Sequence, residues 1–182
     1  MSRQQAVCRS ALVLALAGAL APSGCKNGAL APSGPEAASR PAAARRVPAP
    51  LDLLLPKAIR IHPFTAMRVL EEAGGVTGVD ARVEALDGYG DSGKAFGKFR
   101  FELYSFRPNN PDPKGERLGV WSADVEKPRV NRDHWNKVHR TYQFKLRWGQ
   151  PIPAGQRFVL LAVFESRFTG RLFDERVFIA GP

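Results

Sequence analysis

The sequence predicts an all-β domain, a single antiparallel two-layer β-sandwich of about seven strands. Several segments alternate between apolar and polar residues at a period of two, which is the pattern of half-buried strands. Clusters of Gly, Pro, Asp and Asn separate these segments, and such clusters form turns. The 11 Phe, 3 Tyr and 3 Trp residues all follow residue 63. Because a core needs large apolar side chains, we expect residues 57–182 to be the folded domain.

The strand predictions rest on alternation and on apolar runs between turns. In residues 141–148 every second residue is large and apolar, and residues 99–103 repeat that pattern more briefly. Residues 157–164 are apolar on both faces, as in a central strand, and Thr169-Gly170 is a suitable tight connection to a last strand. The predicted strands are Ala58–His62, Val79–Ala85, Phe99–Leu103, Leu118–Ala123, Thr141–Trp148, Arg157–Phe164 and Leu172–Ile179.

Helical signals are weak and confined to two segments. Residues 65–73 fit a short helix with Thr65 as its cap and Gly74 as its stop, but they also continue a strand-like alternation. Residues 131–138 fit one or two helical turns. Both assignments stay open on the sequence alone.

The two cysteines, Cys8 and Cys25, both precede the first aromatic residue. The predicted domain therefore contains no internal disulfide and no zinc site built on cysteine. We expect its core alone to hold it together. With 126 residues, it is long enough to bury about two thirds of its unfolded-chain surface.

The N-terminus predicts export. Residues 1–9 are polar with two arginines, and residues 11–21 are an unbroken apolar run that is too short to span a bilayer. This is the pattern of a secretory signal peptide, which we assign to residues 1–24. Ala19-Leu20-Ala21 has the spacing of an ordinary cleavage site, but Pro22 would follow the scissile bond, and proline there is a poor substrate.

The next candidate, Pro22-Ser23-Gly24-Cys25, resembles the bacterial lipobox, although Pro22 departs from the aliphatic residue usual there. The resemblance implies a lipoprotein precursor whose Cys25 is acylated, anchoring the chain at the outer membrane or periplasmic face. Plain secretion to the periplasm or medium is the alternative.

A tether is predicted between the lipid site and the domain, over residues 25–56. Residues 26–50 contain eight Ala, five Pro and no aromatic residue. Such a segment cannot bury enough apolar surface to offset the entropy of ordering it. A coil of this length spans about 25–30 Å, so the domain would reach beyond the membrane surface.

Charge and exposed aromatics point to a binding surface. The chain carries a net charge of +10, and residues 57–182 contribute 21 basic and 15 acidic residues, a net +6. A basic surface attracts anionic partners such as an envelope polysaccharide or an acidic protein. Trp135 lies among polar residues, so it is the best candidate for an exposed aromatic, with Arg132, Lys137 and Arg140 beside it. The alternative is a ring folded over the sandwich edge. We expect no nucleic-acid partner, since the other aromatics look buried and the chain looks exported.

One stretch of the domain resembles a known module. Residues 83–106, VEALDGYGDSGKAFGKFRFELYSF, place a strand, a Gly-containing turn and a second strand in succession. They resemble the hairpin of bacterial immunoglobulin-like and transthyretin-like sandwiches. The resemblance implies a fold class only.

Catalytic and metal motifs are weak in this chain. The GDSG at residues 90–93 lacks the fold and the partner histidine that a serine nucleophile needs, so a polar turn is the better interpretation. Asp87 and Asp91 share one loop and could bind calcium or simply close the turn. His134 and His139 are five residues apart, a poor spacing for zinc.

We therefore predict no catalytic residue, metal site or cofactor. The sequence favours a lipid-anchored envelope protein with a binding or structural role. An exported hydrolase with an unrecognised active site is the alternative.

Overall fold

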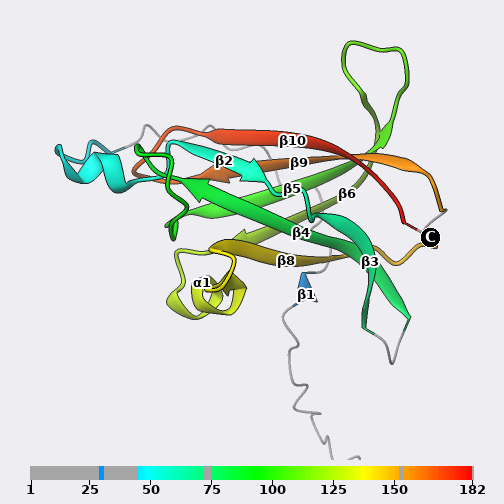
Figure 1. Ribbon diagram of the computed structural model, residues 1–182, viewed down its shortest axis with the longest axis horizontal. Coiled ribbons are helices and arrows are strands. Elements are labelled where there is room, and N and C mark those ends of the chain that lie inside the picture. Colours follow the sequence, from blue (N-terminus) through cyan, green and yellow to red (C-terminus); the bar gives the residue numbers. More distant parts are fainter. Residues whose placement is uncertain (1–28, 31–44, 72–74, 152–153, 182) are drawn as a thin grey trace, which may run out of the picture.

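In a computed structural model, the chain forms two β-sheets packed face to face, with one short α-helix (Figure 1). The structure describes residues 29–30, 45–71, 75–151 and 154–181. The all-β sandwich that the sequence predicts is confirmed. The elements in chain order are β1 (Ala29–Leu30), the 3-10 helix η1 (Leu51–Leu54), β2 (Ala58–Ile61), β3 (Ala66–Glu71), β4 (Val76–Leu86), β5 (Lys98–Phe106), β6 (Lys114–Asp124), α1 (Pro128–His134), β7 (Trp135–Asn136), β8 (Thr141–Arg147), β9 (Arg157–Glu165) and β10 (Leu172–Ile179).

The strand order brings two pairs of strands together at opposite edges of the sandwich. The first sheet runs β1-β8-β4-β2, with β3 also pairing with β4 and β7 with β8. The second sheet runs β10-β9-β5-β6. All pairs are antiparallel except β1 with β8. At one edge of the sandwich the Trp121 indole of β6 reaches the Arg147 carbonyl of β8, and at the other edge β10 lies against β2. We call these the β6/β8 edge and the β2/β10 edge.

All seven predicted strands are present, and in β8 the inward face is the one that the alternation indicates. Tyr142, Phe144 and Leu146 are fully buried, and β9, a central strand between β5 and β10, is buried on both faces over most of its length. The β9–β10 connection through Thr169-Gly170 is a hairpin, with Leu172 opposite Phe164.

The two segments with weak helical signals, residues 65–73 and 131–138, have different structures. Residues 66–71 form strand β3, and the Thr65 hydroxyl binds the backbone of Arg82 on β4 (3.0 and 3.3 Å) instead of capping a helix. In the second segment, α1 begins earlier than expected, at Pro128, and ends at His134. Proline is favoured in the first helical turn because its missing N–H has no partner there.

Residues 83–106, which resemble the hairpin of other sandwich modules in sequence, do not form a hairpin here. β4 belongs to the first sheet and β5 to the second, and the two strands do not pair. The Gly-rich segment between them crosses from one sheet to the other. The physical reason is competition for β4, since its two edges are already occupied by β8 on one side and by β2 and β3 on the other.

Aromatic side chains from both sheets meet in the core. The Phe99 ring of the second sheet lies 5.3 Å from the Tyr142 ring and 5.2 Å from the Phe144 ring of the first sheet. It also lies 4.8 Å from the ring of Phe164 on β9. Such pairs contribute about 0.5–1.5 kcal/mol each beyond the area they bury. The core therefore locks the two sheets in one relative position.

Part of the segment assigned to the tether lies against the domain. The Gly88 amide donates to the Leu53 carbonyl in η1 (2.7 Å), and the Arg45 amide donates to the Arg167 carbonyl. Residues 29–30 pair with β8 at Lys145 and Leu146. The signal peptide and Cys25 lie outside the described residues. No described helix is long and apolar enough to cross a membrane.

Candidate functional site

The four residues predicted to form a binding surface lie at the end of α1 and in the turn that follows. The Trp135 ring is half-buried, edge-on to the Tyr142 ring at 5.1 Å, and packs against the core, which was the alternative interpretation. Arg140 is tied to Ser92, whose carbonyl accepts from the guanidinium (2.6 Å) and whose hydroxyl donates to the Arg140 carbonyl. Arg132, Lys137 and Arg140 are exposed, and of these three Arg140 is the one held by Ser92.

Positive charge gathers in this same connection between β6 and β8. Residues 127–140 contain five Lys or Arg and one acidic residue, Asp133, a net +4. The Arg129 and Arg132 side chains are 86% and 73% exposed. Their Nε atoms lie 3.7 and 3.8 Å from the two carboxylate oxygens of Asp133. One carboxylate cannot neutralise two guanidinium groups. The connection, which we call the basic connection, therefore keeps an excess of exposed positive charge.

The Asp87 loop is held by local hydrogen bonds. One Asp87 carboxylate oxygen accepts from the amides of Tyr89 (2.9 Å) and Asp91 (3.0 Å). This is the turn-closing role that Asp favours at such positions. Ser92 of the GDSG motif is bound to Arg140 as described above. Within the described part of the chain, no three His, Cys, Asp or Glu residues cluster as metal ligands do.

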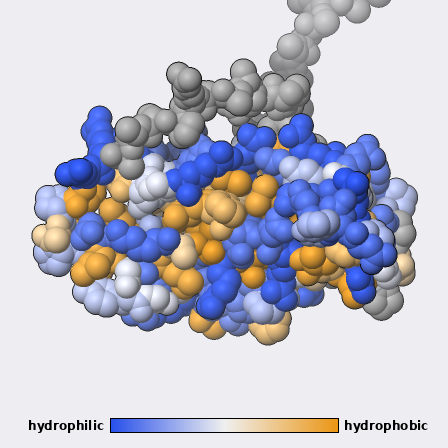
Figure 2. All heavy atoms as spheres, turned by 90° about the horizontal axis from the view of Figure 1, so that it is seen from above, coloured by the Kyte–Doolittle hydropathy of each residue, from blue (hydrophilic) through white to orange (hydrophobic). Residues whose placement is uncertain are grey.

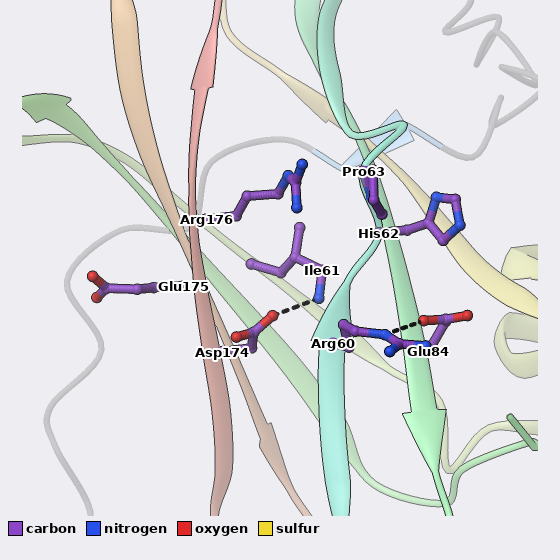
Figure 3. A pocket seen from close by; sticks show the side chains of 8 residues that line it. All are labelled: Arg60, Ile61, His62, Pro63, Glu84, Asp174, Glu175 and Arg176. Carbon is purple, nitrogen blue, oxygen red and sulfur yellow. Dashed lines mark hydrogen bonds and ion pairs between the residues drawn. The ribbon is translucent and has the colours of Figure 1, made fainter. Parts of the chain in front are cut away.

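The sandwich has a cavity of about 460 Å³ at the β2/β10 edge. This edge slot was not foreseen from the sequence. It lies within the size range of small-molecule sites, which is about 300–1,000 Å³. Figure 3 shows the side chains that surround it. They are Arg60, Ile61, His62, Pro63, Glu84, Asp174, Glu175 and Arg176.

The edge slot exists because β10 turns two charged residues toward the core side. Asp174 pairs with Ala162 and Arg176 with Leu160, which are both buried inner positions of β9. The opposite face of β10 carries Phe173, Val177 and Ile179, which are 72%, 42% and 57% exposed. Figure 2 views the molecule from above relative to Figure 1, and hydrophobic residues gather in the middle of the face that it shows. β10 thus turns two charged residues, Asp174 and Arg176, inward and three apolar residues outward. An Asp-Glu-Arg run inside an apolar strand is the signal that could have found the slot.

The three carboxylates of the edge slot are each already bound. Glu84 accepts from Arg60 at 2.7 Å, and that bond is the main cause of the raised pKa of Arg60. Asp174 accepts from the backbone N–H of Ile61 at 2.6 Å. Glu175 points out of the slot (Figure 3) and accepts from Lys114 at 2.6 Å. The pKa of Lys114 is raised by its bonds to Asp112 and, next, to Glu175.

Arg176 has no such partner. Its Nε atom is buried without a hydrogen bond, and its guanidinium makes no ion pair with any residue in the described ranges. Figure 3 shows the group directed into the slot, toward Ile61 and Pro63 on the β2 side. A donor left without an acceptor in this way costs free energy, so a bound acceptor would stabilise the slot.

Two other carboxylates are buried on outward sheet faces, and both are compensated. Asp80 lies within 3.6 Å of Arg68 and 3.4 Å of Arg82, and accepts from Gln143 at 2.8 Å. Glu102 lies 3.0 Å from Arg100 and 3.7 Å from Arg117. It also accepts from the Tyr104 hydroxyl. Burial, followed by that bond, raises the pKa of Tyr104 to about 12. The Nε atoms of Arg82 and Arg100 lack a hydrogen bond, as that of Arg176 does, but each of these two guanidinium groups lies beside a carboxylate, which the Arg176 guanidinium does not among the described residues.

Comparison of the chain with protein families, curated proteins and solved structures gives no match.

Proposed function

We propose that this chain is an exported envelope protein, anchored by a lipid at Cys25, whose β-sandwich acts by binding or as a structural part. The signal-peptide pattern and the lipobox-like Pro22-Ser23-Gly24-Cys25 support the anchor. A lipid at this position would hold the sandwich at a membrane.

The observation that carries the binding role is the basic connection. Its net +4 lies on one short segment, within which Asp133 is the one acidic residue. Asp124, just before the segment, lies 3.8 Å from Lys127. Hydrogen bonds also hold the base of this segment to the domain. The side-chain amide of Asn131 donates to the backbone carbonyls of Ala95 (2.7 Å) and Val125 (2.8 Å). A rigid, positively charged surface favours an anionic partner and raises its association rate. An acidic envelope polysaccharide or an acidic protein surface fits this chemistry.

The binding proposal is tested with a defined polyanion. Titration of the full-length chain with polygalacturonate, a linear polycarboxylate, should show binding that weakens as salt is raised. A triple variant of the basic connection, Arg129→Gln with Arg132→Gln and Lys137→Gln, should lose affinity by about tenfold or more. Calorimetry at two salt concentrations measures both effects.

The matched control removes the same number of charges elsewhere. Arg107, Arg157 and Arg171 are exposed and lie outside the basic connection, so their triple Gln variant should change affinity by less than about threefold. Equal losses in the two triple variants would assign the binding to net charge instead of this surface. Absence of binding by the unmodified chain would refute the anionic partner.

The anchor has its own test. Cys25→Ser should move the protein from the detergent phase to the aqueous phase in a partitioning experiment on the natural envelope. Cys8→Ser, which alters the other cysteine within the signal peptide, is the matched control and should leave the partitioning unchanged. Unaltered partitioning of Cys25→Ser would rule out lipid attachment there.

A second candidate function, an exported hydrolase, is favoured only by the edge slot, which gathers six titratable side chains in one cavity. Its three carboxylates are engaged by Arg60, the Ile61 amide and Lys114. A general base must instead reach the proton it removes. Binding therefore remains the first proposal.

A further inference from the structure

The edge slot has an unbalanced set of charged groups. Each of its three acidic side chains accepts a short hydrogen bond from a group of the protein, at 2.6 or 2.7 Å. Arg60 is occupied by Glu84, and its side chain runs along the β4 side of the slot (Figure 3). Among the charged side chains that line this cavity, Arg176 is the one without a described partner.

We propose that the edge slot binds a small molecule through a carboxylate or phosphate group, held by the guanidinium of Arg176. A guanidinium presents its N–H donors in a planar fork that matches the two oxygens of such a group. The Nε atom of Arg176 is buried and lacks an acceptor. A bound oxyanion would supply that acceptor, so binding would remove a desolvation cost that the free protein bears.

Asp174 is the group in the slot that opposes an anion. Its carboxylate accepts from the Ile61 N–H, and it also contributes, after Glu84, to raising the pKa of Arg60. The partners of Asp174 are therefore the Ile61 amide and the Arg60 charge, both on β2. Arg176 lies two residues further along β10, toward Pro63 (Figure 3). Removing the charge of Asp174 should tighten anion binding, and removing that of Arg176 should abolish it. Opposite effects from two neighbouring residues are hard to obtain by general loss of structure.

The binding test uses two simple probes on the full-length chain. Inorganic phosphate and acetate are titrated separately at constant ionic strength with chloride as the balancing anion. The NMR resonances of the Arg176 Nε–Hε group and of the Ile61 amide are followed. We expect saturable shifts of both resonances with at least one probe. Saturation by phosphate alone identifies a phosphate-bearing ligand, and saturation by acetate identifies a carboxylate.

Three variants locate the site. Arg176→Gln should eliminate the saturable Ile61 shift, and Asp174→Asn, which keeps an acceptor for that amide, should lower the dissociation constant by about threefold or more. Arg171→Gln, the matched control at an exposed position just before the same strand, should leave the binding unchanged.

Two results would overturn the proposal. One is a linear response to both probes, and the other is an unaltered Ile61 shift in Arg176→Gln. If Arg176→Gln does not fold, as judged by circular dichroism, Arg176→Lys replaces it. That variant keeps the charge but loses the fork, so its affinity should fall by about threefold to tenfold. No change there would equally refute the role of the guanidinium. The slot lies at the edge opposite the basic connection, so neither result bears on the polyanion experiment.

Discussion

The two edges of the sandwich are closed in different ways. At the β6/β8 edge, the buried Trp121 indole of β6 donates to the Arg147 carbonyl of β8 at 3.0 Å, directly linking the two sheets. Two further hydrogen bonds lie near this edge. The Asn131 side-chain amide donates to the Ala95 carbonyl, and the Ala95 backbone amide donates to the Tyr142 hydroxyl. At the β2/β10 edge, a single bond from the Ile61 amide to Asp174 joins the strands, and a cavity remains beside it.

The difference follows from the residues that each edge strand turns inward. β6 turns a tryptophan toward the core, and Gly119 makes room for it, since a Cβ there would lie 2.3 Å from the indole. β10 turns Asp174 and Arg176 inward at the corresponding positions of the other edge. Charged side chains keep their heads near water, so they cannot fill the space between sheets as an indole does. An edge strand with inward charges thus leaves a cavity.

The largest expected effect is at the closed edge. Trp121→Ala should lower the free energy of unfolding by about 3–5 kcal/mol, because it removes a fully buried ring and leaves a cavity. Urea unfolding followed by circular dichroism measures the loss. Trp135→Ala removes the same side chain from a half-buried position and should cost clearly less. Equal losses would mean that the two tryptophans close the edge together.

Tyr142→Phe should cost about 1–2 kcal/mol at pH 7, since the buried hydroxyl accepts from the Ala95 amide at 2.9 Å and donates to Asn131 at 3.1 Å. Burial raises the pKa of Tyr142 in the folded state, against the opposing effect of its bonds to Ala95 and Asn131. This phenol therefore contributes its full stability below pH about 10 and loses it as pH rises through the folded pKa.

The free energy of unfolding of the unmodified chain should therefore approach that of Tyr142→Phe as the pH rises above 10. Urea unfolding of both proteins from pH 8 to 11 tests this. Tyr104, whose pKa is also raised, is present in both proteins, so its contribution cancels in the difference. A gap that stays constant over this range would contradict the assignment.

At the open edge, Asp174→Ala should cost about 1 kcal/mol, because it removes one hydrogen bond from a partly exposed carboxylate. Hydrogen exchange at the Ile61 amide should accelerate markedly. Asp174→Asn retains an acceptor oxygen and should protect that amide nearly as well as the original residue. Unchanged exchange in Asp174→Ala would show that another group holds β2 against β10.

The smallest effect is expected for Arg176→Leu. The guanidinium makes no hydrogen bond or ion pair with a described residue, and its buried Nε lacks an acceptor. Its removal should therefore leave the free energy of unfolding equal or raise it by up to about 1 kcal/mol. Urea unfolding measures this, and Arg82→Leu, which leaves the buried Asp80 with one partner fewer, should cost more. A loss above 1 kcal/mol in Arg176→Leu would mean that Arg176 has a structural role.

Much of the fold was predictable because strand alternation reports burial directly. In residues 141–148 the inward residues are aromatic or aliphatic and the outward ones polar, so local pattern and tertiary environment agree. The candidate site was less predictable. Arg132 and Lys137 are exposed, and their role in binding stays a prediction. The contact of Trp135 with Tyr142 and the bond of Arg140 to Ser92 join residues that are distant in the sequence or lie on another strand, so the local pattern did not indicate them.

The sequence by itself determined that this protein is an all-β domain with an aromatic core, since periodicity and composition act locally along the chain. Only the tertiary structure decided which face of β10 is inward. Its alternate residues Phe173, Val177 and Ile179 are the more apolar set, yet they are exposed. Hairpin register with β9 directs Asp174 and Arg176 inward instead, and Phe178 anchors that face against Phe158 with ring centroids 6.1 Å apart. Register is a property of two strands together, so no single strand's pattern could specify it.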